Sequence, residues 1–250
     1  MTNMQLYQYT TIEALSLILK NQTIRFSRLD TVDDPDEYQI EKDGINPSRY
    51  VFLSCWSKVE AESIPMWRMY SSNGVGVRIG LDSDMFEVIY AGEYPYFFNL
   101  DYFFDKDYMM TPLMRGQQYK YPLYDVEYVK STKSQLDKIF KENESGIALD
   151  FKELAKYKSV DWQFQNEVRF VLYFLPKQRN TDRVYNFRTS IPNNVLIEER
   201  FIDVPIRQEV FKSMEIMVGP NVSEAGISIV ESLMFHYLGR KDLHYSIYLP

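Results

Sequence analysis

The spacing of apolar residues changes repeatedly along this 250-residue chain, between every second residue and every third or fourth residue. Residues 75–81 alternate between apolar and small or charged side chains, as a strand with one buried face does. Residues 223–238 carry apolar side chains at helical spacing and are followed by a glycine that can end a helix. Neither an internal repeat nor a linker interrupts this mixture. The sequence therefore predicts an α+β fold, one domain over residues 1–250, with a mixed, mostly antiparallel sheet and flanking helices.

Composition limits the classes of function. The net charge of −7 argues against broad nonspecific binding to nucleic acid. With two histidines and one cysteine, the chain lacks the ligands for a histidine-rich metal site, so we expect no metal cofactor. The apolar runs are shorter than the roughly 18 residues of a membrane helix, and a single cysteine fits a reducing compartment. We expect a cytoplasmic protein without a membrane partner; the sequence leaves its oligomeric state open.

Two segments are harder to assign. Residues 91–123 are rich in Tyr, Phe and Met and follow neither period, so we expect an insertion or a lid packed by aromatic side chains. Residues 151–158 are expected to form a helix before the next strand. At the start of the chain, Thr10 and Glu13 have the spacing of a capping box, which predicts a helix beginning there.

The stretch 162–174 carries the strongest indication of a site. In an extended chain, Glu167 and Arg169 point to one face while Val168 and Phe170 point to the other. Gln165 would lie on the face of Glu167, two residues earlier. The alternative interpretation is a strand with one solvated face, on which Glu167 and Arg169 form a structural ion pair.

Several short motifs resemble, in the same order, those of an uncharacterised bacterial family built on a domain of unknown function. Several members of that family lie near phage-defence genes. The matching motifs span most of the chain: Leu6-Tyr7-Gln8-Tyr9, Ile24-Arg25-Phe26-Ser27, Asp33-Asp34-Pro35, Leu53-Ser54-Cys55-Trp56-Ser57, Trp67-x-x-Tyr70, Gly76-Val77-Arg78-Ile79-Gly80 and Trp162-x-x-x-x-Glu167-Val168-Arg169. The family often has one histidine within the Trp-x-x-Tyr motif, where this chain has Met69, and another just before the glycine strand, where this chain has Asn73 or Gly74. It also often has a basic residue after the first tyrosines, where this chain has Thr10. Those positions supply no acid–base or phosphate-binding group here.

The family also resembles, at a distance, the ADP-ribosyltransferase fold. Such enzymes have a polar first strand, a middle strand with a hydroxyl side chain, and a late strand with the catalytic glutamate. The corresponding residues here would be Gln8, Tyr9 and Thr10, then Ser54, then Gln165 and Glu167. The resemblance implies an ADP-ribosyltransferase-like core and NAD as a substrate.

For this chemistry, the resemblance implies that Glu167 is catalytic, because an ionised carboxylate stabilises the cation-like ribose left as nicotinamide departs. Gln165 would orient the acceptor. The nucleotide would be bound by residues from several motifs: Tyr9, Ser54, Trp67, Tyr70, Arg78 and Arg169. Of these, Trp67 and Tyr70 are candidates to stack on nicotinamide, whereas Arg78 and Arg169, together with Arg25, are candidates to meet the pyrophosphate.

Each of these residues also has a structural interpretation. Trp67 and Tyr70 have the character of core-packing residues, and Ser54 that of a strand hydroxyl bonded to backbone. Cys55 is expected to be an inert buried thiol. Two hypotheses follow. The first is an enzyme that transfers ADP-ribose from NAD to an unknown acceptor macromolecule or hydrolyses NAD, in phage defence or as a toxin. The second is a non-catalytic nucleotide-sensing or protein-interaction module on the same scaffold.

Overall fold

The structure is a computed structural model. It describes residues 3–41, 46–86, 89–90, 108–110, 118–119, 121–143, 146–149, 153–176 and 197–248. At 89–90, 108–110, 118–119, 141–143, 146–149 and 175–176 it describes the backbone alone. The predicted insertion or lid at 91–123 therefore lies almost entirely outside the described residues.

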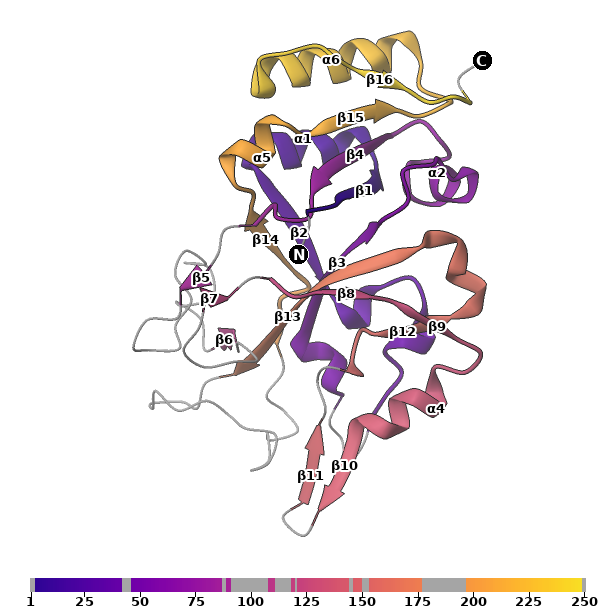
Figure 1. Ribbon diagram of the computed structural model, residues 1–250, viewed down its shortest axis with the longest axis vertical. Coiled ribbons are helices and arrows are strands. Elements are labelled where there is room, and N and C mark those ends of the chain that lie inside the picture. Colours follow the sequence, from indigo (N-terminus) through magenta and orange to yellow (C-terminus); the bar gives the residue numbers. More distant parts are fainter. Residues whose placement is uncertain are drawn as a thin grey trace.

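A large, mostly antiparallel sheet forms the centre of the molecule (Figure 1). Along one path its strands run in the order β14-β2-β3-β1-β4-β15-β16, and β13 pairs with β3 while β6 and β8 pair with β13. Within the described part of the chain its strands are β1 (Gln5–Thr10), β2 (Thr23–Arg28), β3 (Val51–Ser57), β4 (Val77–Asp82), β6 (Tyr108–Met110), β8 (Leu123–Asp125), β13 (Glu167–Pro176), β14 (Phe201–Pro205), β15 (Glu215–Val218) and β16 (His244–Tyr245).

Smaller strand pairs lie outside this sheet: β5 (Ile89–Tyr90) with β7 (Gln118–Tyr119), β10 (Phe140–Asn143) with β11 (Gly146–Leu149), and β12 (Tyr157–Ser159) with β9 (Glu127–Val129). The helices are α1 (Ile12–Asn21), α2 (Ile64–Tyr70), α4 (Lys133–Leu136), α5 (Gln208–Lys212) and α6 (Glu224–Leu238), with the 3-10 helices η1 (Leu29–Thr31), η2 (Pro35–Glu37), η3 (Pro47–Tyr50), η4 (Asp137–Ile139) and η6 (Val160–Gln165). The predicted single domain with a mixed α and β content and a mostly antiparallel sheet is confirmed.

The chain begins with a strand, a helix and a second strand. The helix α1 starts one residue later than the capping box predicts: Thr10 is the last residue of β1, and the Thr11 hydroxyl accepts a hydrogen bond from the Ala14 amide. The left-handed residue Gln22 (φ 55°) ends α1 and turns the chain into β2. This geometry places α1 between two strands that both approach β3.

One edge of β3 is shared by two neighbours. Phe52 and Leu53 pair with β2, whereas Ser57 pairs with Tyr7 of β1. Between these two points lie residues 54–56, where β1 and β2 diverge and the Gln8 side chain donates a hydrogen bond to the Cys55 carbonyl at 2.9 Å. On its other edge β3 pairs continuously with β13, from Val51 to Ser57. The sheet is therefore split along one side of its central strand.

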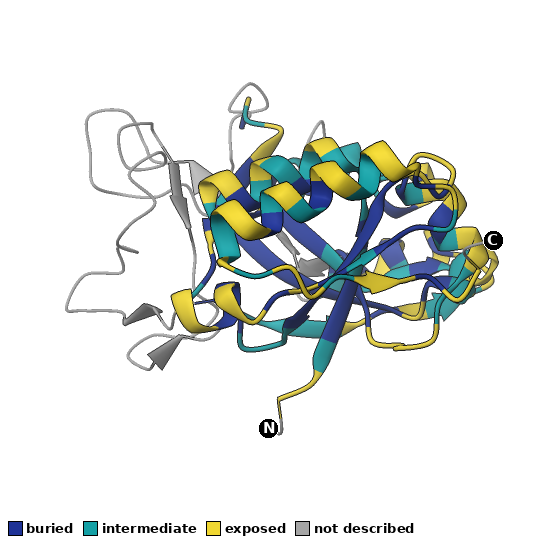
Figure 2. Cartoon of the chain, turned by 90° about the horizontal axis from the view of Figure 1, so that it is seen from above, coloured by how far each residue is buried: buried dark blue, intermediate teal, exposed yellow. Residues whose placement is uncertain are grey.

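Two apolar layers enclose the sheet. The larger one lies under α1 and α6, which pack side by side and show buried stripes beneath an exposed outer surface (Figure 2). Alternation along β13 sends Val168 and Phe170 into this layer, as predicted from the sequence. The second layer receives Val171 and Tyr173 from the opposite face of β13. The face that carries Glu167 and Arg169 is thus buried rather than solvated.

The strand β4 depends on one glycine at its start. A Cβ atom on Gly76 would lie 2.2 Å from the carbonyl oxygen of Thr10, so only glycine lets the two backbones approach there. The neighbour that requires glycine at this position is backbone, not a side chain. At Gly80 a Cβ would meet side chains, the nearest being Gln5 at 3.0 Å.

Two local predictions are wrong. Gln165 is not on the strand: it ends the 3-10 helix η6, and the left-handed residue Asn166 (φ 46°) separates it from β13. The predicted helix at 151–158 is also incorrect where it is described, because Tyr157 and Lys158 belong to β12, which pairs in parallel with β9. In both places backbone pairing and turn geometry override the local pattern.

Candidate functional site

A cavity of about 430 Å³ opens where β1 and β2 diverge from β3. Its walls come from β1, α1, β2, β3, the residues before η2, α2 and the segment from Lys158 to Arg169. Because the edge of β3 is open at residues 54–56, side chains from both faces of this strand reach the cavity. Segments that are more than 100 residues apart in the sequence therefore meet around one space.

Four charged side chains form a buried cluster at one wall of the cavity (Glu37, Lys158, Glu167 and Arg169). Arg169 donates from Nε to Glu167 Oε1 at 2.6 Å, from Nη1 to Glu37 Oε2, and from Nη1 to the Ala155 carbonyl at 3.0 Å. Lys158 Nζ lies 3.0 Å from Glu167 Oε2 and 3.3 Å from Glu37 Oε1. No side chain of the four is more than 5 % exposed. Their formal charges cancel.

Glu167 is ionised in this environment. Burial raises the pKa of its carboxyl group, but the charges of Arg169 and Lys158 and the hydrogen bonds from Arg169 and Cys55 outweigh burial and lower the pKa to about 2. Its negative charge is nevertheless balanced by two cations within 3.0 Å. The field that Glu167 projects into the cavity is consequently weaker than that of an isolated carboxylate.

Cys55 lies opposite Arg169 in the register of β3 and β13, and it lines the cavity. Burial raises the pKa of its thiol well above the usual range, the charge of Glu167 adds to this effect, and Arg169 and Lys158 oppose it only in part. The thiol therefore stays protonated, which agrees with its interpretation as inert. Its surroundings are charged, however, not apolar as the strand pattern suggests.

A hydrogen bond joins Gln165 and Tyr70, which line the cavity together with Asp33. The Gln165 amide donates from Nε2 to the Tyr70 hydroxyl at 2.6 Å. Burial, followed by the neighbouring Asp33 carboxylate, raises the pKa of Tyr70 far above its usual value. Tyr70 thus stays a neutral phenol that fixes the position of Gln165.

The structure brings six of the eight predicted site residues to the cavity: Tyr9, Ser54, Tyr70, Gln165, Glu167 and Arg169. The Ser54 hydroxyl accepts a hydrogen bond from the Trp56 indole at 3.0 Å, so its partner is a side chain rather than the expected backbone. The Tyr9 hydroxyl accepts from the Ser63 amide at 3.0 Å at the start of α2. Both hydroxyl groups are therefore held in place by neighbouring groups.

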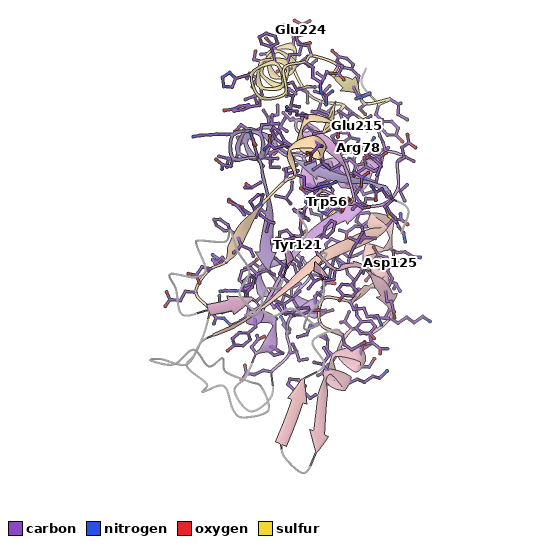
Figure 3. All side chains as sticks on the ribbon, turned by 60° about the vertical axis from the view of Figure 1, so that its left-hand side comes forward. Trp56, Arg78, Tyr121, Asp125, Glu215 and Glu224 are labelled. Carbon is purple, nitrogen blue, oxygen red and sulfur yellow. The ribbon has the colours of Figure 1, made fainter. Side chains whose placement is uncertain are left out.

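Trp67 and Arg78 do not line the cavity. Trp67 is buried, stands edge-on to Tyr9 at 4.8 Å between ring centroids, and donates from its indole to Glu62 at 2.8 Å. Arg78 lies over the ring of Tyr7 and donates to a backbone carbonyl at 2.6 Å. In Figure 3 Arg78 is found beside β15 in the upper part of the molecule, above Trp56. Both residues support the wall behind the cavity, which favours their packing interpretation.

Arg25 is the cation at the mouth of the cavity. Its side chain is 47 % exposed, pairs with Asp203 at 2.9 Å and lies over the ring of Phe201 at 3.6 Å. Among the described residues that line the cavity, three cations (Arg25, Lys158 and Arg169) face three carboxylates (Asp33, Glu167 and Asp203). The lining therefore carries no net formal charge, and each of the three cations already has an acidic partner.

Sequence reasoning missed Glu37 and Lys158. Glu37 belongs to the acidic stretch 33–37, whose sequence is typical of a solvated turn. Lys158 belongs to residues 151–158, which were expected to form a helix. No pattern along the chain signals that these side chains meet Arg169, because Glu37 is 132 residues distant from it.

In the described part of the chain, no group of three or more His, Cys, Asp or Glu side chains is arranged to hold a metal ion.

With this geometry in hand, comparison with known proteins gives one result. Residues 66–170 match the family described as Protein of unknown function (DUF2971). The matched segment includes most of α2, all of β4 and the residues up to Phe170, and thus Tyr70, Gln165, Glu167 and Arg169, whereas β1 and Ser54 precede it. The expectation of a domain of unknown function is confirmed, and its link to phage defence stays a prediction.

No curated protein and no solved structure matches the chain. The resemblance to ADP-ribosyltransferases therefore remains a prediction drawn from motif order. Among the described residues, the helices are too short or too polar to cross a membrane.

Proposed function

We propose that the protein binds NAD or a closely related nucleotide in this cavity and uses Glu167 to transfer its ADP-ribose or to hydrolyse it. One observation carries the proposal. The three elements assigned from motif order, residues 8–10, Ser54 and residues 165–167, all contribute to the lining of a single cavity. Short motifs that are spread over about 160 residues are expected to lie together only if they belong to one site or one core. Here they line one cavity.

The lining suits a nucleotide in size and chemistry. A volume of about 430 Å³ falls within the usual range of small-molecule sites, roughly 300–1,000 Å³. Tyr7, Tyr9 and Tyr70 supply aromatic surface for a planar ring. Arg25, at the exposed mouth, is the cation best placed for a pyrophosphate, because Arg169 is buried between two carboxylates.

The proposed reaction breaks the bond between the ribose carbon and nicotinamide, which leaves with the bonding electron pair. The ribose becomes cation-like, and the ionised Glu167 stabilises that charge more than it stabilises the neutral sugar. An acceptor nucleophile or a water molecule then adds to the same carbon and loses a proton. Gln165, held by Tyr70, would orient the group that adds.

A second candidate is a nucleotide sensor without catalysis, and the charge cluster favours it. Both oxygens of Glu167 are engaged, one by Arg169 at 2.6 Å and one by Lys158 at 3.0 Å. A carboxylate that is neutralised in this way stabilises a developing cation poorly unless ligand binding moves one of its partners. The same cavity would then bind the nucleotide and leave it intact.

Two measurements separate these candidates. Thermal shift with NAD tests binding, since a ligand that binds only the folded protein raises its stability as the ligand concentration exceeds Kd. Release of nicotinamide, with and without a protein extract as a source of acceptor, tests catalysis. We expect wild type to release nicotinamide and Glu167→Gln to lose about 100-fold or more of the rate.

The matched control is Glu224→Gln, which removes an exposed carboxylate from α6, remote from the cavity (Figure 3). It should release nicotinamide at the wild-type rate. Stabilisation by NAD with no release from any of the three proteins would refute catalysis and leave the sensor. If NAD neither stabilises wild type nor is cleaved by it, the proposed function is wrong.

A further inference from the structure

One flank of α1 faces the cavity. Residues three and four positions apart lie on the same side of a helix, and those that line the cavity follow this spacing: Ala14, Leu17, Ile18 and Asn21. Leu15 and Leu19 point elsewhere, into the apolar core under the sheet. Leu17 is 49 % exposed, so this flank is accessible to a ligand. We call its apolar part, Ala14, Leu17 and Ile18, the α1 wall.

The strand β2 leads from the end of α1 to β3 (Figure 1). Alternation turns every second residue of β2 toward the cavity: Thr23, Arg25 and Ser27. Thr23 comes two residues after the end of α1, and Ser27 pairs with Leu53 of β3. Neighbouring side chains on one strand face are about 7 Å apart. Arg25 is therefore placed midway between α1 and β3, which pairs on its other edge with the strand of Glu167.

Arg25 is held in position and keeps donors for a ligand. Its Nε and Nη2 donate to the Asp203 carboxylate at 2.9 and 3.1 Å, and the guanidinium lies over the ring of Phe201. These contacts leave Nη1 without a hydrogen-bond partner in the described part of the chain, and the side chain is about half exposed. Nη1 can consequently bind a phosphate oxygen while the pair with Asp203 stays intact.

We propose that the adenine base of the nucleotide lies against the α1 wall, with the pyrophosphate at Arg25. A dinucleotide carries its pyrophosphate between two nucleosides. With the nicotinamide ribose at Glu167 and the pyrophosphate at Arg25, the second nucleoside extends toward α1, where an apolar surface can cover the face of its base. The inference rests on the proposed function, because it takes the position of the reacting ribose from Glu167. In the reverse orientation Glu167 would face the adenosine ribose, where the proposed reaction breaks no bond.

The test measures, by calorimetry, the affinities of three ligands that divide the nucleotide. NAD has both ends, ADP-ribose lacks nicotinamide, and nicotinamide mononucleotide lacks adenosine. Leu17→Asn removes apolar surface from the α1 wall, keeps the approximate size of the side chain and adds no charge. We expect this variant to bind NAD and ADP-ribose about tenfold less tightly than wild type, the factor that corresponds to the apolar area of a partly exposed leucine. Its affinity for nicotinamide mononucleotide should be that of wild type.

Two further variants complete the design. Ile229→Asn makes the same kind of change at an exposed apolar residue of α6 that does not line the cavity, so all three affinities should stay at the wild-type values. Arg25→Gln removes the cation assigned to the pyrophosphate. Because each of the three ligands carries phosphate, this variant should weaken all of them by about tenfold. The pattern expected of Leu17→Asn thus differs from that of a general loss of binding.

The outcomes are distinct. If Leu17→Asn weakens nicotinamide mononucleotide as much as NAD, the nicotinamide end lies on the α1 wall and the inferred orientation is wrong. If Leu17→Asn leaves the affinity for NAD within about twofold of wild type, the α1 wall does not hold the base, and the inference is wrong while nucleotide binding stands. If wild type binds neither NAD nor ADP-ribose, the proposed function fails and the inference fails with it.

Discussion

Replacing Arg169 by methionine should destabilise the protein more than any single change at its surface. Methionine has a similar length and is apolar, so it removes the charge and the hydrogen bonds with little change in packing. The change leaves Glu37 and Glu167 buried with Lys158 as their remaining cation, and it also strips the donor from the Ala155 carbonyl. The cluster would then hold one excess negative charge away from water.

The size of the effect follows from this imbalance. Removing one partner from a buried ion pair typically costs about 3–5 kcal/mol, mainly because the other charge is left uncompensated. Arg169 is fully buried and bound to two carboxylates, so we expect a loss of about 4 kcal/mol in the free energy of unfolding. The matched control is Arg25→Met, which breaks a half-exposed pair and should cost about 1 kcal/mol or less.

A double variant tests the reasoning by restoring neutrality. Glu37→Gln alone leaves two cations facing Glu167 and should also destabilise the protein. Together with Arg169→Met it leaves Lys158 and Glu167 as a balanced pair, so the double variant should lose about 2 kcal/mol less than the sum of the single losses. Urea denaturation of wild type, the two single variants, the double variant and the control Arg25→Met at neutral pH measures these differences. Additive losses, or an Arg169→Met loss no larger than that of Arg25→Met, would refute the argument.

Two further predictions concern the stability of the protein at acid pH and the close contact between Gly76 and the Thr10 carbonyl. The pKa of Glu167, about 2, lies below its value of roughly 4.3 in an unfolded chain, so its contribution of about 3 kcal/mol is complete above about pH 4.5 and is lost as pH falls toward 2. The difference in stability between wild type and Glu167→Gln should shrink over this window; a difference that stays constant from about pH 6 to 2 would contradict it. Gly76→Ala places a Cβ 2.2 Å from the Thr10 carbonyl and should cost about 2 kcal/mol or more by thermal denaturation, whereas Gly80→Ala meets the end of the Gln5 side chain first and should cost less. Equal losses from the two glycine variants would show that the close approach is not what requires glycine.

The parts of the fold that could be predicted are those whose signal is local. The helix α6 begins at the Ser223 cap and ends before Gly239, as its apolar spacing and its end residues indicate. Alternation along β13 correctly separates Val168 and Phe170 from Glu167 and Arg169. Such patterns report which face of an element is apolar, and burial follows from that.

The candidate site was harder to predict because its contacts are distant in sequence. Glu37 reads as part of a solvated acidic turn, and its pairing with Arg169 exists only once η2 is folded against β13. The period of residues 151–158 favours a helix, but parallel pairing with β9 makes Tyr157 and Lys158 a strand. The placement of Gln165 depends on the left-handed Asn166, a turn that periodicity does not reveal.

The divided edge of β3 also has a mechanical consequence. Along that edge β1 is joined to β3 by the register pair Tyr7–Ser57 and by the Gln8 side chain, while β2 joins farther along at Phe52 and Leu53. The angle between the half of the sheet that contains β1 and the half that contains β2 thus depends on the few hydrogen bonds that join β1 to one end of β3. A substitution at Gln8 would change how wide the space between the halves opens, and it would leave the hydrogen-bonded ladder within each half intact.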